Sequence, residues 1–94
     1  MPDNETVRFE RPGHVLVRTV AEEALLLNTS TETYFSLDAV GRTAFEALAE
    51  GCTISEAVSV LCESFDEADP AVVQYDVEEL VGAFLSAGLL SHRR

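Results

Sequence analysis

The sequence of 94 residues has no tryptophan and no lysine, and it contains only two cysteines and two histidines. No apolar run approaches the roughly 20 residues that a membrane-spanning helix needs, and the polar, acidic start of the chain is unlike a secretory signal. The five glycines are isolated, so a glycine-rich phosphate-binding loop is also absent. These absences argue against a membrane partner. They indicate one small soluble domain, which we expect in the cytoplasm.

The residue groups that catalysis requires are missing as well. Cys52 and Cys62 have no metal-ligand spacing, and His14 and His92 stand at opposite ends of the chain. Catalysis needs a nucleophile beside a base, carboxylates paired in a cleft, or a metal cluster. We therefore predict a protein that is not an enzyme and that binds no metal and no cofactor. Cys62 lies within an apolar pattern and is expected to be a small core residue.

The charge is strongly one-sided, with a net value of −11 and arginine as the only basic residue type. Between Arg42 and Arg93 there is no basic residue, and this stretch holds ten carboxylates. Such a surface repels nucleic acid, because neutralisation of phosphates by lysine and arginine supplies most of the affinity. We therefore expect no nucleic-acid partner. The charge favours a partner of basic character, or it simply keeps the protein soluble.

The first half of the chain has the composition of short strands. Residues 14–20, 24–28 and 32–37 are apolar or β-branched, and polar turns at 21–23 and 29–31 separate them. Parallel pairing would need a long crossover, so the pattern predicts an antiparallel meander. Residues 1–13 contain Pro2, Pro12 and Gly13 and are expected to form a flexible N-terminal segment, with 7–9 suited to a short extension of the sheet. The domain proper is then 14–94.

After residue 38 the apolar spacing becomes helical, and three helices follow. Each is expected to begin at an N-capping residue, and glycines are expected to end the first and third. These positions are Asp38, Thr53 with Glu56 in a capping box, Asp69 before Pro70, Gly51 and Gly88. The fold class is therefore α+β: an N-terminal three-stranded antiparallel sheet followed by three helices, arranged as a winged helix-turn-helix.

Two other small-protein classes fit this pattern less well. An acyl carrier protein needs a serine after an aspartate at a helix start, whereas Ser36 follows Phe35. A DNA-binding winged helix needs a basic recognition helix, and the helices expected at 54–64 and 70–87 have no arginine. A winged-helix regulator or adaptor that acts through protein contacts stays open as the alternative function.

Three segments together resemble the PqqD-like family: "EALLLNTSTETYFSLDAVGRTAFEAL" (23–48), "TISEAVSVLCESFD" (53–66) and "VVQYDVEELVGAFLSAGLL" (72–90). The matching positions are Tyr34, Phe35, Leu37, Gly41, Asp76, Val77 and 88–90. The resemblance covers about 14–90, and the start of the chain is similar to freestanding members of lasso-peptide pathways. The family often has glycine in the first hairpin turn and before the aromatic pair. This chain has Ala21-Glu22-Glu23 and Thr33 at those places, so the turn types stay open.

The resemblance implies a recognition element for ribosomally made, post-translationally modified peptides. Such a protein binds the leader of a precursor peptide as an added strand and presents it to a leader peptidase or another modifying enzyme. An unpaired strand edge supplies the backbone groups, and pockets beside it select side chains. The residues implied are Glu32, Thr33, Tyr34, Phe35, Ser36 and Leu37 on the edge strand, and Val72, Val73, Asp76 and Leu80 on the third helix.

The side chains of this strand also fit a plainer role as filler of a small sheet. Alternation places Phe35 and Leu37 on one face, where we expect them in the core, and Tyr34 and Ser36 on the other. Asp76 is the polar residue best suited to the leader, because its carboxylate would accept leader N–H groups or pair with a basic leader residue. It also fits an ordinary solvated helix position.

Overall fold

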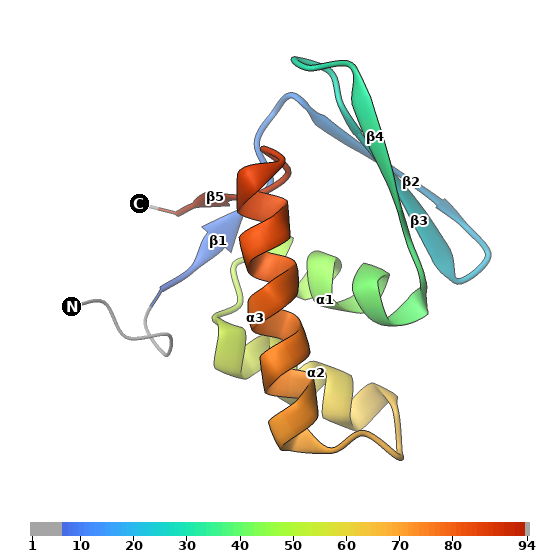
Figure 1. Cartoon of the computed structure of the whole chain (residues 1–94), viewed down its shortest axis with the longest axis vertical. Helices are drawn as coiled ribbons and strands as arrows, with labels where there is room; N and C mark the ends of the chain where they lie inside the picture. Colours follow the sequence, from blue (N-terminus) through green and yellow to red (C-terminus); the bar gives the residue numbers. More distant parts are fainter. Residues whose placement is uncertain (1–6, 94) are drawn as a thin grey trace.

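The computed structural model describes residues 7–93, which form a small sheet beside a body of three helices (Figure 1). The elements in chain order are β1 (Phe9–Glu10), β2 (Val15–Val20), β3 (Glu23–Asn28), β4 (Thr33–Leu37), α1 (Ala39–Ala49), α2 (Ile54–Ser64), α3 (Pro70–Ser86) and β5 (Ser91–His92). This α+β architecture with a three-stranded antiparallel sheet confirms the predicted class. The winged helix-turn-helix arrangement stays a prediction.

The helices begin and end where the local sequence chemistry predicts. Asp38 accepts the N–H of Gly41 at 2.8 Å, and Asp69 accepts that of Ala71 at 3.0 Å, with proline in the first turn of α3. Thr53 and Glu56 form the reciprocal capping box of α2. Each interaction satisfies an N–H that the start of a helix leaves without an intrahelical acceptor.

The main sheet has the strand order β2-β3-β4, with both neighbours antiparallel to β3. The β2–β3 hairpin pairs Val20 with Glu23 across a two-residue turn, and the β3–β4 hairpin pairs Asn28 with Thr33. Ala21 and Glu32, one in each turn, have φ values of +56° and +57°. These are the two turns whose types stayed open, and both use a conformation that favours glycine.

The core lies between the inner face of the sheet and the helices. Val15 and Leu26 of the sheet are fully buried, as are Phe45 of α1 and Val77 and Phe84 of α3. The rings of Phe45 and Phe84 meet edge to face, with centroids 5.2 Å apart, an arrangement that the aromatic quadrupole favours. α1 and α3 are therefore held together directly through the core.

Part of the segment expected to be flexible, residues 7–10, contacts the core and the end of the chain. Phe9 is only 2% exposed and belongs to the core, and its ring lies 5.3 Å from that of His92. β1 pairs with β5 in a separate two-stranded sheet and does not extend the main one. Apolar burial of one aromatic side chain thus anchors this segment despite Pro12 and Gly13 beside it. The rest of the expected N-terminal segment, 1–6, lies outside the described residues.

A polar contact joins the β3–β4 hairpin to the end of α3. The side chain of Asn28, which is 2% exposed, donates to the carbonyl of Ala87 at 2.9 Å and accepts the N–H of Ser30 at 3.0 Å. His14 lies 3.1 Å from the carbonyl of Gly88. Gly88 has a φ of +72°, and a Cβ there would come within 2.9 Å of the Asn28 amide nitrogen. This contact fixes the end of α3 against the sheet.

Two expectations about the core are wrong. Phe35 lies on the inner face of β4 as predicted, opposite Leu26, but its side chain is 37% exposed. It stands on β4, which is an edge strand of the sheet among the described residues. Cys62 is half-buried and outside the core cluster, because it lies on the flank of the apolar stripe of α2 whose centre is Leu61.

Candidate functional site

β4 has a neighbour on one side only, so its other edge is free within the described residues. The backbone groups that point to this edge follow from the register. The N–H of Thr29 donates to the carbonyl of His14 at 2.9 Å, and bonded pairs alternate along an antiparallel ladder. The backbone N–H and C=O groups of Leu25 and Leu27 therefore bond to β2. Those of the alternate residues, Ala24 and Leu26, bond to β4.

The same alternation continues across β3 to β4. Leu26 pairs with Phe35 and Ala24 with Leu37, so the N–H and C=O groups of these two β4 residues point toward β3. The backbone groups of Tyr34 and Ser36 then point outward. These two residues present the donors and acceptors of the open edge.

A groove runs beside this edge, between the end of β4 and the face of α3, and consists of two hollows. The first has a volume of about 600 Å³ and is lined by Ser36, Leu37, Asp38, Val40, Gly41, Asp76, Glu79 and Leu80. The second has about 420 Å³ and is lined by Val40, Leu61, Phe65, Glu67, Ala68, Asp69, Val72, Val73, Asp76, Val77 and Leu80. Because three residues line both hollows, we treat them as one β4–α3 groove.

The structure brings six of the predicted site residues together at this groove. Ser36 and Leu37 line it from the strand side, and Val72, Val73, Asp76 and Leu80 line it from α3. The other four, Glu32, Thr33, Tyr34 and Phe35, lie along the strand and its turn and do not line either hollow. Tyr34 is 71% exposed on the opposite face of the sheet.

The sequence reasoning missed the floor of the groove. Val40 comes from the first turn of α1 and is 40% exposed, and Leu61 and Phe65 come from the end of α2. Val40 was assigned to the apolar stripe of the first helix. Leu61 and Phe65 were assigned to the core stripe of α2. Only the packing of α2 against α3 shows that they also line a surface hollow.

The groove is apolar at its floor and acidic at its rim. Asp38, Asp76 and Glu79 line the hollow next to β4, and no basic residue lines either hollow among the described residues. Asp38 is engaged as the helix cap of α1. A hydrogen bond to Glu79, with its negative charge, raises the pKa of Tyr75 on the same helix. The rim therefore suits ligand groups that donate hydrogen bonds or carry positive charge.

The described residues 7–93 were expected to hold no metal site and no reactive cysteine. Groups of three or more metal-ligating side chains are absent from this part of the chain. Burial, together with the charges of Glu56 and Glu50, raises the pKa of Cys52, which opposes formation of the nucleophilic thiolate. In the same residues, no helix is both long and apolar enough to cross a bilayer.

A family model described as coenzyme PQQ synthesis protein D (PqqD) matches residues 23–90. The chain belongs to the PqqD family. The resemblance predicted from the sequence is thereby confirmed. The match begins with β3 and ends just beyond α3, so the open edge and the groove of this PqqD-family chain both lie inside it.

Solved structures of similar fold are complexes with leader peptides. A structure described as TbiB1 in complex with the TbiA(beta) leader peptide is 30% identical, with a TM-score of 0.79 over 87% of this chain and 94% of that chain. A structure described as lasso peptide synthetase B1 complexed with the leader peptide is 17% identical, with a TM-score of 0.77 over 89% and 98%. The second likeness is one of fold alone. No curated protein matches the sequence.

Proposed function

We propose that this protein binds the leader segment of a ribosomally synthesised precursor peptide as a fourth strand on β4 and presents it to a processing enzyme. The observation that carries the proposal is the open edge at Tyr34 and Ser36 beside the β4–α3 groove. Strand addition supplies affinity through backbone hydrogen bonds, and pockets for alternate side chains supply specificity. Family membership and the leader complexes of the similar structures support the same reading.

The residues that line the groove indicate which leader side chains would bind there. Side chains on the helix-facing side of the added strand would reach the floor formed by Val40, Leu61 and Phe65, so apolar anchors are expected there. Phe35, exposed on the same side of β4, extends this apolar surface toward the edge. Asp76 at the rim would accept leader N–H groups or pair with a basic side chain.

The protein acts as a carrier in this proposal and performs no chemistry of its own. The processing enzyme is a leader peptidase in a lasso-type pathway, or another modifying enzyme where the product class differs. A carrier must release its peptide, which fits an interface built on one strand edge and a shallow groove.

A pair of proline variants tests strand addition. Proline has no N–H and is tolerated where that group faces away from the ladder. Tyr34→Pro removes an outward donor of β4 and is expected to weaken binding of a fluorescein-labelled leader by about tenfold or more, measured by anisotropy. Thr19→Pro is the matched control, because alternation points its N–H to the outer edge of β2.

Circular dichroism and thermal unfolding establish that each variant is folded. Leader affinity within about twofold of the parent for a folded Tyr34→Pro protein would show that β4 is not the docking edge. A large loss in Thr19→Pro with none in Tyr34→Pro would move the peptide to β2.

A further inference from the structure

Two polar side chains from the sheet side of the molecule hold the end of α3. The side chain of Asn28, at the end of β3, donates to the carbonyl of Ala87 at 2.9 Å. His14, directly before β2, has its ring nitrogen Nε2 3.1 Å from the carbonyl oxygen of Gly88. A carbonyl oxygen only accepts, so Nε2 carries the donated proton. We call His14, Asn28 and Gly88 the α3 clamp.

The helix end satisfies other carbonyls by itself. The positive φ of Gly88 forms a C-terminal turn in which the N–H of Leu89 donates to Phe84 at 2.8 Å and that of Gly88 donates to Leu85 at 3.2 Å. The carbonyls of Ala87 and Gly88 instead take their donors from clamp side chains that are 59 and 74 positions away in the chain. The place where α3 ends is therefore fixed by the sheet side of the molecule.

The same two side-chain donors also hold the turn that leads into β4. The backbone carbonyl of His14 accepts the N–H of Thr29 at 2.9 Å and its hydroxyl at 2.8 Å. The side-chain oxygen of Asn28 accepts the N–H groups of Ser30 at 3.0 Å and Thr31 at 3.3 Å. One hydrogen-bonded unit thus joins the β3–β4 turn to the end of α3.

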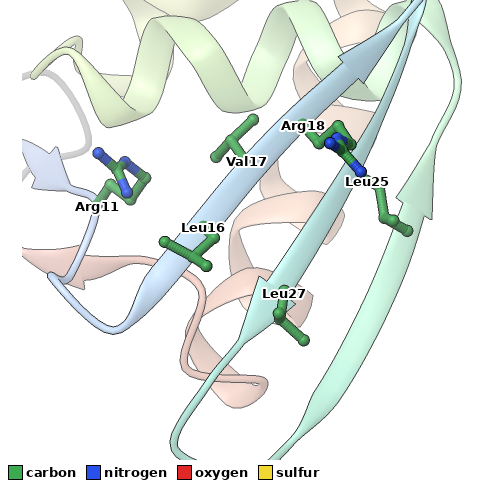
Figure 2. Close-up of a pocket in the computed structure, with 6 residues that line it drawn as sticks. All are labelled: Arg11, Leu16, Val17, Arg18, Leu25 and Leu27. Atoms are coloured by element: carbon green, nitrogen blue, oxygen red, sulfur yellow. The ribbon is translucent and has the colours of Figure 1, made fainter.

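The segment that carries His14 is fixed on its other side. The N–H of Val15 donates to the carbonyl of Pro12 at 3.1 Å, which closes a tight turn around His14. The guanidinium of Arg11 donates to the carbonyl of Val15, and Figure 2 shows Arg11 on the segment before β2. The ring of His14 therefore projects from an ordered turn, so its contact with Gly88 resists movement of α3 relative to the sheet.

The clamp residues line neither hollow of the β4–α3 groove, yet both sides of the groove depend on them. Asn28 pairs with Thr33, the first residue of β4. Leu80, on the opposite side, lies about 10 Å along the helix from Ala87, at ~1.5 Å per residue. A rotation of about 10° between sheet and helix at the clamp would therefore move Leu80 by about 2 Å relative to β4. A gap of that size removes most of the van der Waals attraction to a side chain seated in the groove.

We propose that the α3 clamp sets leader affinity by positioning the wall of the groove, without touching the peptide. This inference rests on the proposed function and adds positioning residues to it. With its hydrogen bonds intact, the clamp holds β4 and α3 at the spacing that the leader needs before it binds. Less ordering of the site then opposes binding.

Two substitutions of His14 test the role of its hydrogen bond. His14→Gln keeps an N–H donor near the position of Nε2, whereas His14→Leu keeps the bulk and removes the donor. Binding of fluorescein-labelled leader is measured by anisotropy, well below the thermal midpoint of each variant. We expect His14→Leu to weaken binding about fivefold and His14→Gln to stay within twofold of the parent. Glu56→Gln, which lowers stability elsewhere in the fold, should bind leader like the parent.

The position of the wall is measured separately by heteronuclear NMR of the protein without leader. We expect His14→Leu to shift the amide resonances of Ser36 and Leu80, which line the groove from its two sides. His14→Gln should leave both resonances near their parent values. A loss of stability alone does not move resonances of the folded state, so this measurement separates positioning from stability.

A matched pair of glycine variants tests the close approach at the clamp. A Cβ at Gly88 would lie 2.9 Å from the amide nitrogen of Asn28 and 3.9 Å from Nε2 of His14, whereas a Cβ at Gly82 on the same helix meets nothing within 4 Å. We expect Gly88→Ala to weaken leader binding at least tenfold and Gly82→Ala to keep it within twofold. If Gly88→Ala does not fold, the His14 variants decide the question.

The outcomes separate the clamp from the carrier function. If the parent binds leader and His14→Leu binds it equally well, the positioning role is wrong while the carrier function stands. Equal losses in His14→Leu and His14→Gln, or unchanged resonances of Ser36 and Leu80 in His14→Leu, would also overturn it. If the parent does not bind leader, the carrier function fails, and this inference fails with it.

Discussion

The sheet has two free edges that look alike in sequence but differ in their surroundings. β2 and β4 are both short and largely apolar, and among residues 7–93 each of them pairs only with β3. Beside β4 lies a groove walled by α3, with apolar side chains at its floor and carboxylates at its rim. Beside β2 lies a hollow on the face of the sheet, with arginines at its margin.

If the leader binds at β4 as proposed, an open strand edge alone is not enough to make a peptide site. Both edges offer backbone donors and acceptors, so backbone pairing cannot distinguish them. What distinguishes β4 is a neighbouring wall that can hold side chains of an added strand. The wall depends on where α3 lies, and Asn28 together with His14 links the sheet side of the molecule to the end of that helix.

The largest effect is expected from removing this link. Asn28→Ala deletes the 2.9 Å bond to the carbonyl of Ala87 and leaves the N–H groups of Ser30 and Thr31 without their acceptor. We expect a loss of about 2–3 kcal/mol in the free energy of unfolding, since three part-buried hydrogen bonds of about 1 kcal/mol each are lost. Urea denaturation measures it. Asn28→Asp keeps the acceptor for Ser30 and Thr31 but sets a buried carboxylate oxygen against the carbonyl of Ala87, so it should lose at least as much at pH 7. Equal stability of Asn28→Ala and the parent would show that the Asn28 contact does not hold α3 against the sheet.

The next largest effect is expected from a change in the groove wall, which lies beside β4 and not beside β2. Val72→Asp adds a carboxylate to a wall that already has an acidic rim, and it removes an apolar contact. We expect leader binding to weaken about tenfold, or ~1.4 kcal/mol, with little change in stability because Val72 is 56% exposed. Gln74→Asp, at an exposed position of α3 that does not line the groove, is the control. Similar losses in both variants would indicate a general charge effect.

The turn next to β2 should tolerate a substitution that stabilises the fold. Ala21 has a φ of +56°, and glycine adopts this conformation without the steric cost that a Cβ imposes. We expect Ala21→Gly to stabilise the protein by about 0.5–1 kcal/mol in thermal unfolding, with leader binding unchanged because β4 lies across the sheet. Glu22→Gly, at the neighbouring residue without a positive φ, should destabilise. The opposite order of the two variants would contradict the strained turn.

The smallest effect is expected at Glu56. This residue lines none of the hollows beside the two edges, so its variant is a reference for a change elsewhere in the fold. Hydrogen bonding to the N–H of Thr53, and then to Arg8, lowers the pKa of Glu56 below 4.5. A lowered folded-state pKa gives stability that is present above about pH 4.5 and lost as the pH falls through the folded value. Glu56→Gln should therefore be less stable than the parent at pH 7, and the difference should shrink below pH 4.5. A difference that is constant with pH would mean that the charge of Glu56 contributes nothing.

The elements themselves could be predicted from local chemistry, and the site only in part. Asp38, Thr53 and Asp69 begin the helices as expected, because an N-cap depends on atoms within three residues. The role of Phe35 could not be predicted, since alternation gives its face but not how far the helices extend over that face. Asn28 carried no signal either, because its main partner, Ala87, is 59 positions away in the chain.

The sequence by itself determined the order and type of the elements, the antiparallel sheet and the acidic character of the surface. These depend on hydrophobic period, capping residues and composition, which are properties of neighbouring residues. The tertiary structure alone decided which sheet edge has a wall beside it, which side chains form the floor of the groove, and where the few arginines gather. Those features depend on how α3 packs against the sheet, and that contact joins residues far apart in the chain.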